Sequence, residues 1–267
     1  MSYDLKAAIA AAAKTGPNMN EAQSGGDYEI PASGIARARF VGYYEMGKHE
    51  EEFQGQKKLR DKVELVFELS GPNHPPRDIN GEKVPQRITA RETYGLTDRN
   101  HFLKLFRQMN YSGKATHMAE LLAEPFLVEI FHTKSKDGKK TYANLRGPNG
   151  YNVKGTTVQD PVSGQMVTVD VPPAMTDVKV FLWDQACKEM WDSIYIAGEY
   201  AERKDEKTGE VISPAKSKNV LQDKIRSAKN FSEIAPLVEA SAPPLPDAET
   251  PPRSTAPANA DPLAHIG

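Results

Sequence analysis

Residues 125–147 read PFLVEIFHTKSKDGKKTYANLRG, and this stretch decides the fold. Two runs of alternating apolar and polar residues flank Asp137-Gly138, and Asp-Gly between such runs is a strong signal for a hairpin turn. A two-residue turn fixes the register of the two strands. The predicted cross-strand pairs are Lys136 with Lys139, Thr133 with Tyr142, Phe131 with Asn144, and Glu129 with Arg146.

Because side chains alternate across a strand, this register gives the hairpin two different faces. The apolar face is expected to contact a core and carries Val128, Ile130, Ala143 and Leu145. The opposite face carries Glu129, Phe131, Tyr142, Asn144 and Arg146. This mixture of aromatic, amide and guanidinium groups suits stacked bases, and it equally suits an ordinary half-exposed sheet face.

Charge is unevenly distributed along the 267-residue chain, although the formal net charge is only −2. Residues 35–147 hold 20 lysines and arginines against 15 aspartates and glutamates, so this section is net +5 and the flanks are net acidic. A basic centre suits a partner that carries negative charge.

Cys187 is the single cysteine, so neither an intramolecular disulfide nor a zinc cluster of cysteines can form, which favours a reducing compartment. No run approaches the roughly 20 apolar residues of a membrane span. The alanine-rich residues 1–16 are interpreted as a short helix or arm and not as a signal peptide, because Asp4 interrupts their front. We therefore expect a cytoplasmic protein that does not enter a membrane.

Alternation of apolar and polar residues predicts three strands before the hairpin, at 35–44, 59–69 and 85–96. Polar loops are expected between them, at 45–58 and 71–84. Apolar residues at helical spacing between 102 and 109 predict an amphipathic helix that Thr97 or Asp98 caps. Residues 114–123 add a shorter helical segment before the hairpin.

Three strands, a helical connection and two further strands form the chain order of an OB-fold, a partly open five-stranded barrel. The predicted fold class is therefore mainly β with helices (α+β), an OB-fold barrel with a C-terminal β and helical extension. The segments expected after the barrel are a β excursion at 151–171, a strand at 178–183, and helices at 184–197 and 217–229.

This order predicts four parts of the chain. They are a flexible N-terminal arm (1–34), an OB-fold nucleic-acid-binding core (35–150), a β-hairpin and helical extension (151–235), and a disordered tail rich in proline and alanine (236–267). The tail is expected to be disordered because it has too little apolar surface to offset its ordering entropy.

The outward positions of the predicted strands carry candidate nucleic-acid-binding residues, because cations suit phosphates and rings stack on bases at roughly 1–3 kcal/mol each. The candidates for phosphate contact are Arg37, Arg39, Lys57, Lys58, Arg60, Arg87, Arg91 and Arg146. The candidates for base contact are Tyr43, Phe131 and Tyr142, with Asn144 beside them. Lys57, Lys58 and Arg60 fall between the first two strands, where OB-folds often clamp their ligand.

Single candidates also have a purely structural interpretation. Arg146 could pair with Glu129, Arg91 could be a solvated sheet arginine, and Tyr142 could simply cover the hairpin. For any one residue this interpretation is favoured, whereas the set as a whole favours nucleic acid. Trp183 and Trp191 are expected to pack in the C-terminal helical section.

Catalysis is poorly supported by the sequence. It contains no Gly-rich phosphate loop, nucleophile elbow, HExxH motif or cysteine–histidine metal spacing. The acidic residues 50–52 would suit a nuclease metal site, but a solvated loop is the favoured interpretation. We therefore predict a protein that is not an enzyme, with no catalytic residue, no metal ligand and no cofactor.

Three segments carry a family resemblance: GYYEMGKHEEEFQGQKK, RDKVELVFEL and DGKKTYANLRG. Together with AKSKNVLQDKIRSAKNF they resemble the single-stranded-DNA-binding proteins of tailed bacteriophages, including N4-like phages, over roughly residues 35–231. The resemblance implies an OB-fold that binds single-stranded DNA with little sequence preference, in the host cytoplasm. It also implies a role in phage DNA replication or recombination, or as a transcription cofactor that helps the phage RNA polymerase at melted promoters.

The predicted partners are thus single-stranded DNA and either phage RNA polymerase or replication proteins, and a homo-oligomer is left open. The alternative is a structural or assembly protein whose OB-like barrel binds another protein. That alternative predicts no salt-dependent binding of DNA and no effect of Arg146→Ala.

Overall fold

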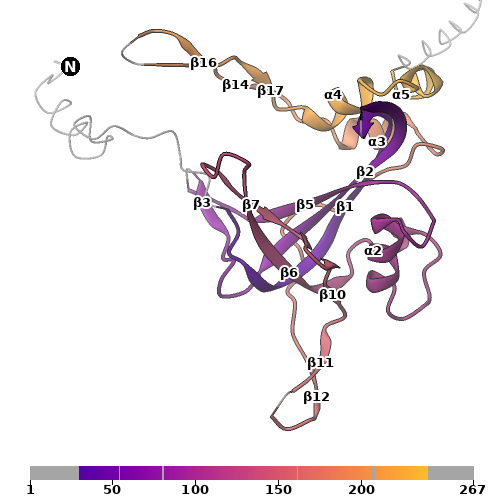
Figure 1. The fold of residues 1–267 in the computed structure, drawn as a ribbon, viewed down its shortest axis with the longest axis vertical. Helices are drawn as coiled ribbons and strands as arrows, with labels where there is room; N and C mark the ends of the chain where they lie inside the picture. The colour runs from indigo at the N-terminus through magenta and orange to yellow at the C-terminus, as the bar shows by residue number, and fades with distance from the viewer. Residues whose placement is uncertain (1–29, 54, 80, 161, 206–207, 240–267) are drawn as a thin grey trace, which may run out of the picture. The chain divides into compact units, whose positions relative to one another are not determined.

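The computed structural model describes residues 30–239, with gaps at 54, 80, 161, 206 and 207 (Figure 1). The predictions made for residues 1–29 and for the tail from 240 onward lie outside the described residues. The described chain divides into two compact units. The first is built from residues 30–45 and 60–180, and the second from residues 46–59 and 181–239.

A large antiparallel sheet organises the chain, with its strands in the order β10-β6-β1-β2-β5, while β7 pairs with β6 and β13 with β1. The strands are β1 (Gly34–Phe53), β2 (Gln56–Ser70), β5 (Arg87–Thr93), β6 (Pro125–Lys134), β7 (Thr141–Asn144), β10 (Val153–Lys154) and β13 (Lys179–Phe181). The class expected from the sequence, mainly β with helices, is therefore confirmed. Within the described residues the sheet does not close into a barrel, because β10 and β5 remain its two ends.

Apolar side chains at alternate positions of these strands form the core of the first unit. Ala36 lies opposite Val128, and Ala38 lies opposite Phe126, so β1 and β6 bury the same face. The rings of Phe40, Phe67 and Phe126 meet in this core, with centroids 5.2 Å and 6.5 Å apart. Six predicted core positions are fully buried: Val63, Leu65 and Phe67 on β2, and Val128, Ile130 and Leu145 from the hairpin stretch.

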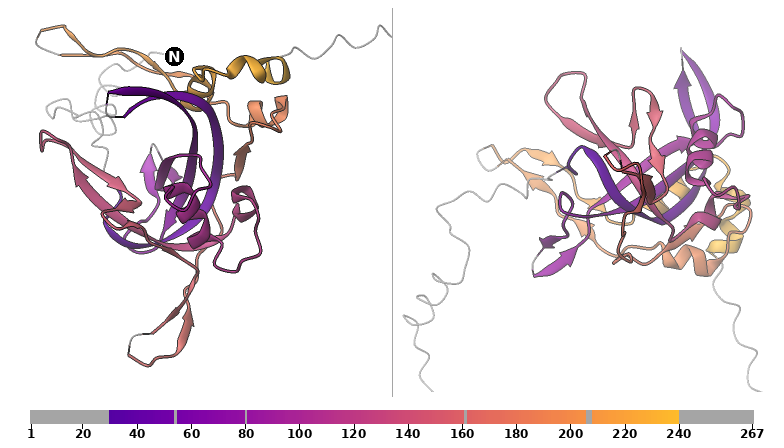
Figure 2. Two further views of the ribbon diagram at one scale, coloured as in Figure 1. Left: turned by 45° about the vertical axis from the view of Figure 1, so that its right-hand side comes forward. Right: turned by 90° about the horizontal axis from the view of Figure 1, so that it is seen from below.

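Strands β1 and β2 are much longer than expected, and they continue through the polar stretch 45–58 that was predicted to be a loop. The prediction was wrong because this stretch has few apolar residues, while Gly55 with φ +74° supplies the tight turn between the strands. Figure 2 shows β1 and β2 in indigo as neighbouring strands. The two strands are thus shared by both units.

The amphipathic helix α2 (His101–Met109) follows β5 as predicted and buries Phe102, Leu105 and Met109. Its N-cap is Asn100, whose side-chain oxygen accepts a hydrogen bond from the backbone N–H of Phe102 at 2.8 Å. The predicted caps, Thr97 and Asp98, lie three and two residues too early. A short 3₁₀ helix η1 (Met118–Leu121) then leads to β6.

Short two-stranded ribbons extend from the first unit. They are β3 (Arg77–Ile79) with β4 (Glu82–Val84), β8 (Arg146–Gly147) with β9 (Gly150–Tyr151), and β11 (Thr157–Gln159) with β12 (Met166–Thr168). The first ribbon lies in the stretch 71–84 that was predicted to be a loop. The β11–β12 ribbon and β9–β10 make up the β excursion predicted at 151–171, and the ribbon projects away from the sheet (Figure 1).

The second unit combines short helices and ribbons. Its elements are α3 (Lys188–Ser193), α4 (Val220–Arg226), η2 (Phe231–Glu233), α5 (Ala235–Val238), and the strand pairs β14 (Glu199–Tyr200) with β17 (Lys216–Ser217) and β15 (Arg203–Lys204) with β16 (Val211–Ser213). Both predicted helices are present but shorter than expected. The two strand pairs were not predicted, because their charged sequence shows no alternation.

Candidate nucleic-acid interface

The β6–β7 hairpin has the register that the sequence predicts. Phe131 lies opposite Asn144, and Thr133 lies opposite Tyr142. The turn is longer than two residues and spans 135–140, closed by a hydrogen bond from the N–H of Ser135 to the carbonyl of Lys140 at 2.8 Å. The pairings of β6 with β1 and β10 end at Ile130, and residues 131–134 pair with β7, so this end of the hairpin forms an arm.

The tip of this arm is strongly basic. Four exposed lysines lie within seven residues, with Asp137 as the one acidic residue among them: Lys134, Lys136, Lys139 and Lys140. Asp137 accepts hydrogen bonds from the backbone of Lys139 and from the Ser135 hydroxyl, and these bonds hold the pKa of its carboxyl below the usual range. In the part of the chain that the structure describes, no carboxylate forms an ion pair with these lysines. Their charges are therefore open to solvent.

The aromatic residues of the arm differ in accessibility. Tyr142 is 50% exposed. Phe131 is half-buried, because its ring packs flat against Gly147, where an added Cβ would lie 2.7 Å from the ring. Asn144 donates a hydrogen bond from Nδ2 to Oγ1 of Thr133 at 2.7 Å. Of the three predicted base contacts on this arm, Tyr142 offers the most open ring.

Arg146 does not pair with Glu129, so that predicted cross-strand pair is wrong. Strand β7 ends at Asn144, and Glu129 instead accepts a hydrogen bond from Nδ2 of Asn152 at 2.6 Å. Arg146 reaches across to Glu92 on β5, with Nη1 2.8 Å from Oε1. Tyr151 donates its hydroxyl to the same oxygen at 2.7 Å, and burial together with Glu92 raises the pKa of Tyr151. Arg146 therefore has a structural partner in a nearly buried carboxylate.

Arg39 also forms its hydrogen bonds within the protein. Its guanidinium donates to three backbone carbonyls, those of Ala123 at 2.7 Å, Val171 at 2.6 Å and Pro172 at 2.8 Å. Glu68 on β2 binds the same connecting segment. Its carboxylate accepts hydrogen bonds from the N–H groups of Met175 and Thr176 at 2.7 Å each. We call residues 171–176 the strap. The strap accepts hydrogen bonds from the guanidinium of Arg39, which the sequence assigned to phosphate.

Tyr43 is fully buried, which corrects its expected role as a base-stacking residue. Its ring packs against Phe102 with centroids 6.4 Å apart, and His117 meets it edge-on. The hydroxyl donates to Oε1 of Glu45 at 3.1 Å, and burial raises the pKa of Tyr43. Residues 40–44 of β1 are all buried, so both faces of the strand are covered there, and alternation with a single buried face could not predict this.

The remaining arginines of the sheet divide into paired and unpaired side chains. Arg91 pairs with Glu64, its cross-strand neighbour, with Nε 3.1 Å from Oε1. Arg37 and Arg87 form no ion pair with any residue that the structure describes. Arg37 and Arg87 are thus the predicted sheet cations that remain available to a ligand.

Lys57, Lys58 and Arg60 lie at the start of β2 and not in a loop. Lys57 pairs with Glu50 at 2.8 Å on the neighbouring strand, whereas Lys58 and Arg60 are exposed. Lys57 and Lys58 belong to the second unit and Arg60 to the first. The structure therefore brings together the residues of the arm, but it does not gather all predicted cations into one site.

The lysines at the arm's tip are not among the binding residues that the sequence predicted. The signal was present in the sequence, because KSKDGKK lies inside the stretch that defines the hairpin. Alternation along a strand does not mark these residues, since they lie at the turn and not on a strand face.

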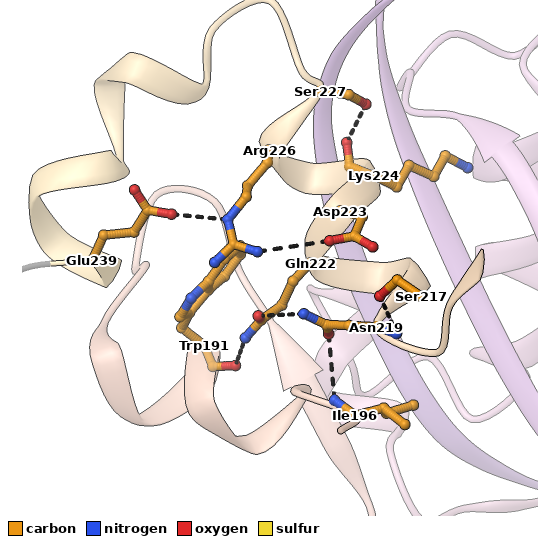
Figure 3. Close-up of polar contacts among 10 residues, drawn as sticks. All are labelled: Trp191, Ile196, Ser217, Asn219, Gln222, Asp223, Lys224, Arg226, Ser227 and Glu239. Carbon is orange, nitrogen blue, oxygen red and sulfur yellow. Dashed lines mark hydrogen bonds and ion pairs between the residues drawn. The ribbon is translucent and has the colours of Figure 1, made fainter. Parts of the chain in front are cut away.

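The second unit has a packed aromatic centre. Trp191 is 4% exposed and lies between Phe181 and Phe231, as the sequence predicts for a packing residue. Arg226 stacks on Trp191 with its Cζ 4.9 Å from the ring centroid, and Glu239 holds its Nε at 2.9 Å (Figure 3). Arg226 is thus engaged within the unit.

Comparison with protein-family models, with curated proteins and with solved structures finds no match. The resemblance to phage proteins therefore stays a prediction. Among the described residues, none of the helices has the length and apolar character needed to cross a membrane.

Proposed function

We propose that this chain is a non-enzymatic protein that binds single-stranded DNA, with the β6–β7 arm as its main contact. The observation that carries the proposal is the arm itself. Four lysines without ion-pair partners among the described residues surround its tip, and the half-exposed ring of Tyr142 lies directly beside them. Unpaired cations next to an open aromatic ring are the combination by which proteins hold single strands.

The sheet supports the same proposal at the level of fold. A helix separates the third long strand, β5, from the fourth, β6, and β6 returns to pair with β1. This connectivity is that of an OB-fold, and we propose that the sheet is a partly open barrel of this type. A role in phage replication, or beside the phage RNA polymerase, follows from the sequence resemblance and is proposed on that basis.

Fluorescence anisotropy with a labelled oligo-dT, set against a duplex of the same length, tests the proposal. We expect tighter binding of the single strand, with an affinity that falls as salt rises. Equal binding to both DNAs, or no binding at low salt, would overturn it.

A variant with four substitutions tests whether the arm binds the DNA. Changing Lys134, Lys136, Lys139 and Lys140 to glutamine is expected to weaken oligo-dT binding by tenfold or more at moderate salt. Each lost phosphate contact also lowers the log–log salt slope by about 0.7. The matched control changes four exposed lysines elsewhere: Lys48, Lys83, Lys104 and Lys154. Equal losses in the two variants would mean that only total charge matters.

The β11–β12 ribbon favours a second candidate, a protein-binding role. Residues 155–178 contain no lysine or arginine, and Val162 and Met166 are 95% and 65% exposed. A ribbon that lacks cations and exposes apolar side chains suits a protein surface better than DNA. If the chain were purely an assembly protein, the fourfold lysine variant would bind its protein partner as tightly as the unchanged chain does.

A further inference from the structure

A cleft of about 350 Å³ opens on the first unit between the α2–η1 connection and the start of β6. This volume lies in the range of sites that hold small organic groups, roughly 300–1,000 Å³. The residues that matter for its chemistry are Tyr111, Lys114, Glu120, Glu124 and Phe126. The cleft is separate from the β6–β7 arm, since Phe126 lies at the opposite end of β6 from the tip.

Hydrogen bonds fix the wall of this cleft. Asn110 and Ala115 form two hydrogen bonds. Nδ2 of Asn110 donates to the carbonyl of Ala115 at 2.7 Å, and the N–H of Ala115 donates to Oδ1 of Asn110 at 3.0 Å. Glu120 accepts from the backbone of Thr116 and of His117, and the bonds from Thr116 hold the pKa of Glu120 below its usual range. The loop is therefore preorganised for a ligand.

Tyr111 supplies an aromatic wall. One part of its ring covers Gly155, where an added Cβ would lie 2.7 Å from Cζ of Tyr111. The ring also packs edge-to-face with Phe126, with the two ring centroids 6.4 Å apart. Although these contacts fix the ring, 59% of Tyr111 is exposed. A fixed and open ring is suited to stacking against a flat group.

Glu124 and Lys114 provide opposite charges at the same cleft. Neither side chain has a hydrogen-bond or ion-pair partner among residues that the structure describes. The backbone before Glu124 is strained, because Ala123 has φ +68° and is the one non-glycine described with a positive φ. Two long-range bonds hold it there, from the N–H of Ala123 to Phe40 at 2.8 Å and from Arg39 to its carbonyl. Such strain is found where a fold positions a functional group.

We propose that this cleft holds one guanine base of the bound single strand. The ring lies against Tyr111, the Glu124 carboxylate accepts the N1–H and N2–H of the base, and Lys114 contacts the neighbouring phosphate. An ionised carboxylate can only accept hydrogen bonds. Guanine is the base that presents two adjacent N–H donors on one edge, whereas thymine presents carbonyls beside its N–H. The inference rests on the proposed function, because the base belongs to the same strand.

Anisotropy with three oligonucleotides tests the inference: dT20, dT20 with one central dG, and dT20 with inosine at that place. The full chain is expected to bind the dG strand at least about fivefold more tightly than dT20, as a bidentate base contact allows. Inosine lacks the N2 amino group and should give an intermediate affinity. Glu124→Gln should abolish the preference, so that the variant binds the dG strand and dT20 with equal affinity.

The control variant is Glu82→Gln, an exposed glutamate on β4, which should keep the preference for dG. Normal binding of dT20 without any gain from dG would overturn this inference and leave the proposed function standing. Failure to bind any of the strands would overturn both. A dG preference that survives in Glu124→Gln would place the guanine elsewhere and also contradict the inference.

Discussion

Arg37 and Arg39 lie two residues apart on β1, yet they differ in every contact. Arg39 donates to three carbonyls, and Arg37 forms no ion pair with the described residues. Arg39→Ala is expected to lower the free energy of unfolding by about 2–3 kcal/mol, because it leaves three carbonyls without their charged donor. Urea unfolding measures this loss.

Arg37→Ala is the matched control for stability, and it should change the free energy of unfolding by less than about 0.5 kcal/mol. It should instead weaken oligo-dT binding if the sheet contributes to the interface. A larger loss of stability from Arg37 than from Arg39 would contradict the assignment of the two roles.

Tyr44 predicts how stability depends on alkaline pH. Burial raises its pKa from 10.0 to about 12. The unfolded chain thus releases this proton at lower pH than the folded chain does, so stability is full below pH 10 and falls between pH 10 and 12. The share of one such group is at most about 2–3 kcal/mol. Tyr44→Phe should flatten the decline, as thermal melts across this range would show, and an unchanged slope would contradict the prediction.

At the scale of elements, the strap explains why the outer face of the sheet is only partly open. Glu68 holds it through both carboxylate oxygens. Glu68→Gln removes one acceptor and should destabilise the fold by about 1–2 kcal/mol. Hydrogen exchange at the amides of Met175 and Thr176 should become faster. Glu82→Gln serves as the control, and unchanged exchange in Glu68→Gln would show that the strap is held by other contacts.

The hairpin shows how much an element's sequence can predict. Its register over residues 131–134 and the burial of Val128, Ile130 and Leu145 were predicted correctly, because alternation is a local property, whereas Ala143 is only half-buried. The partner of Arg146 was predicted wrongly, because β10 replaces β7 beside β6 and no local signal marks the replacement. The helix α2 was likewise predicted, although its cap was misplaced by two or three residues.

At the scale of the whole molecule, both tryptophans lie in the second unit. The proposed arm and cleft lie in the first. If DNA contacts the first unit alone, binding of oligo-dT should leave tryptophan emission nearly unchanged, while anisotropy of the labelled DNA rises. Strong quenching would instead place DNA beside Trp183 or Trp191 and would contradict the assignment of the interface.

The sequence by itself determined the β-rich class, the alternating core and the lysine-tipped hairpin, since each depends on neighbours along the chain. Only the tertiary structure decided which cations are free. Arg39 finds its carbonyls 132 and 133 residues away, and Arg146 finds Glu92 at a separation of 54 residues. A guanidinium on a strand face looks the same in a sequence whether it meets a phosphate or a distant carbonyl, and its partner depends on how the chain returns.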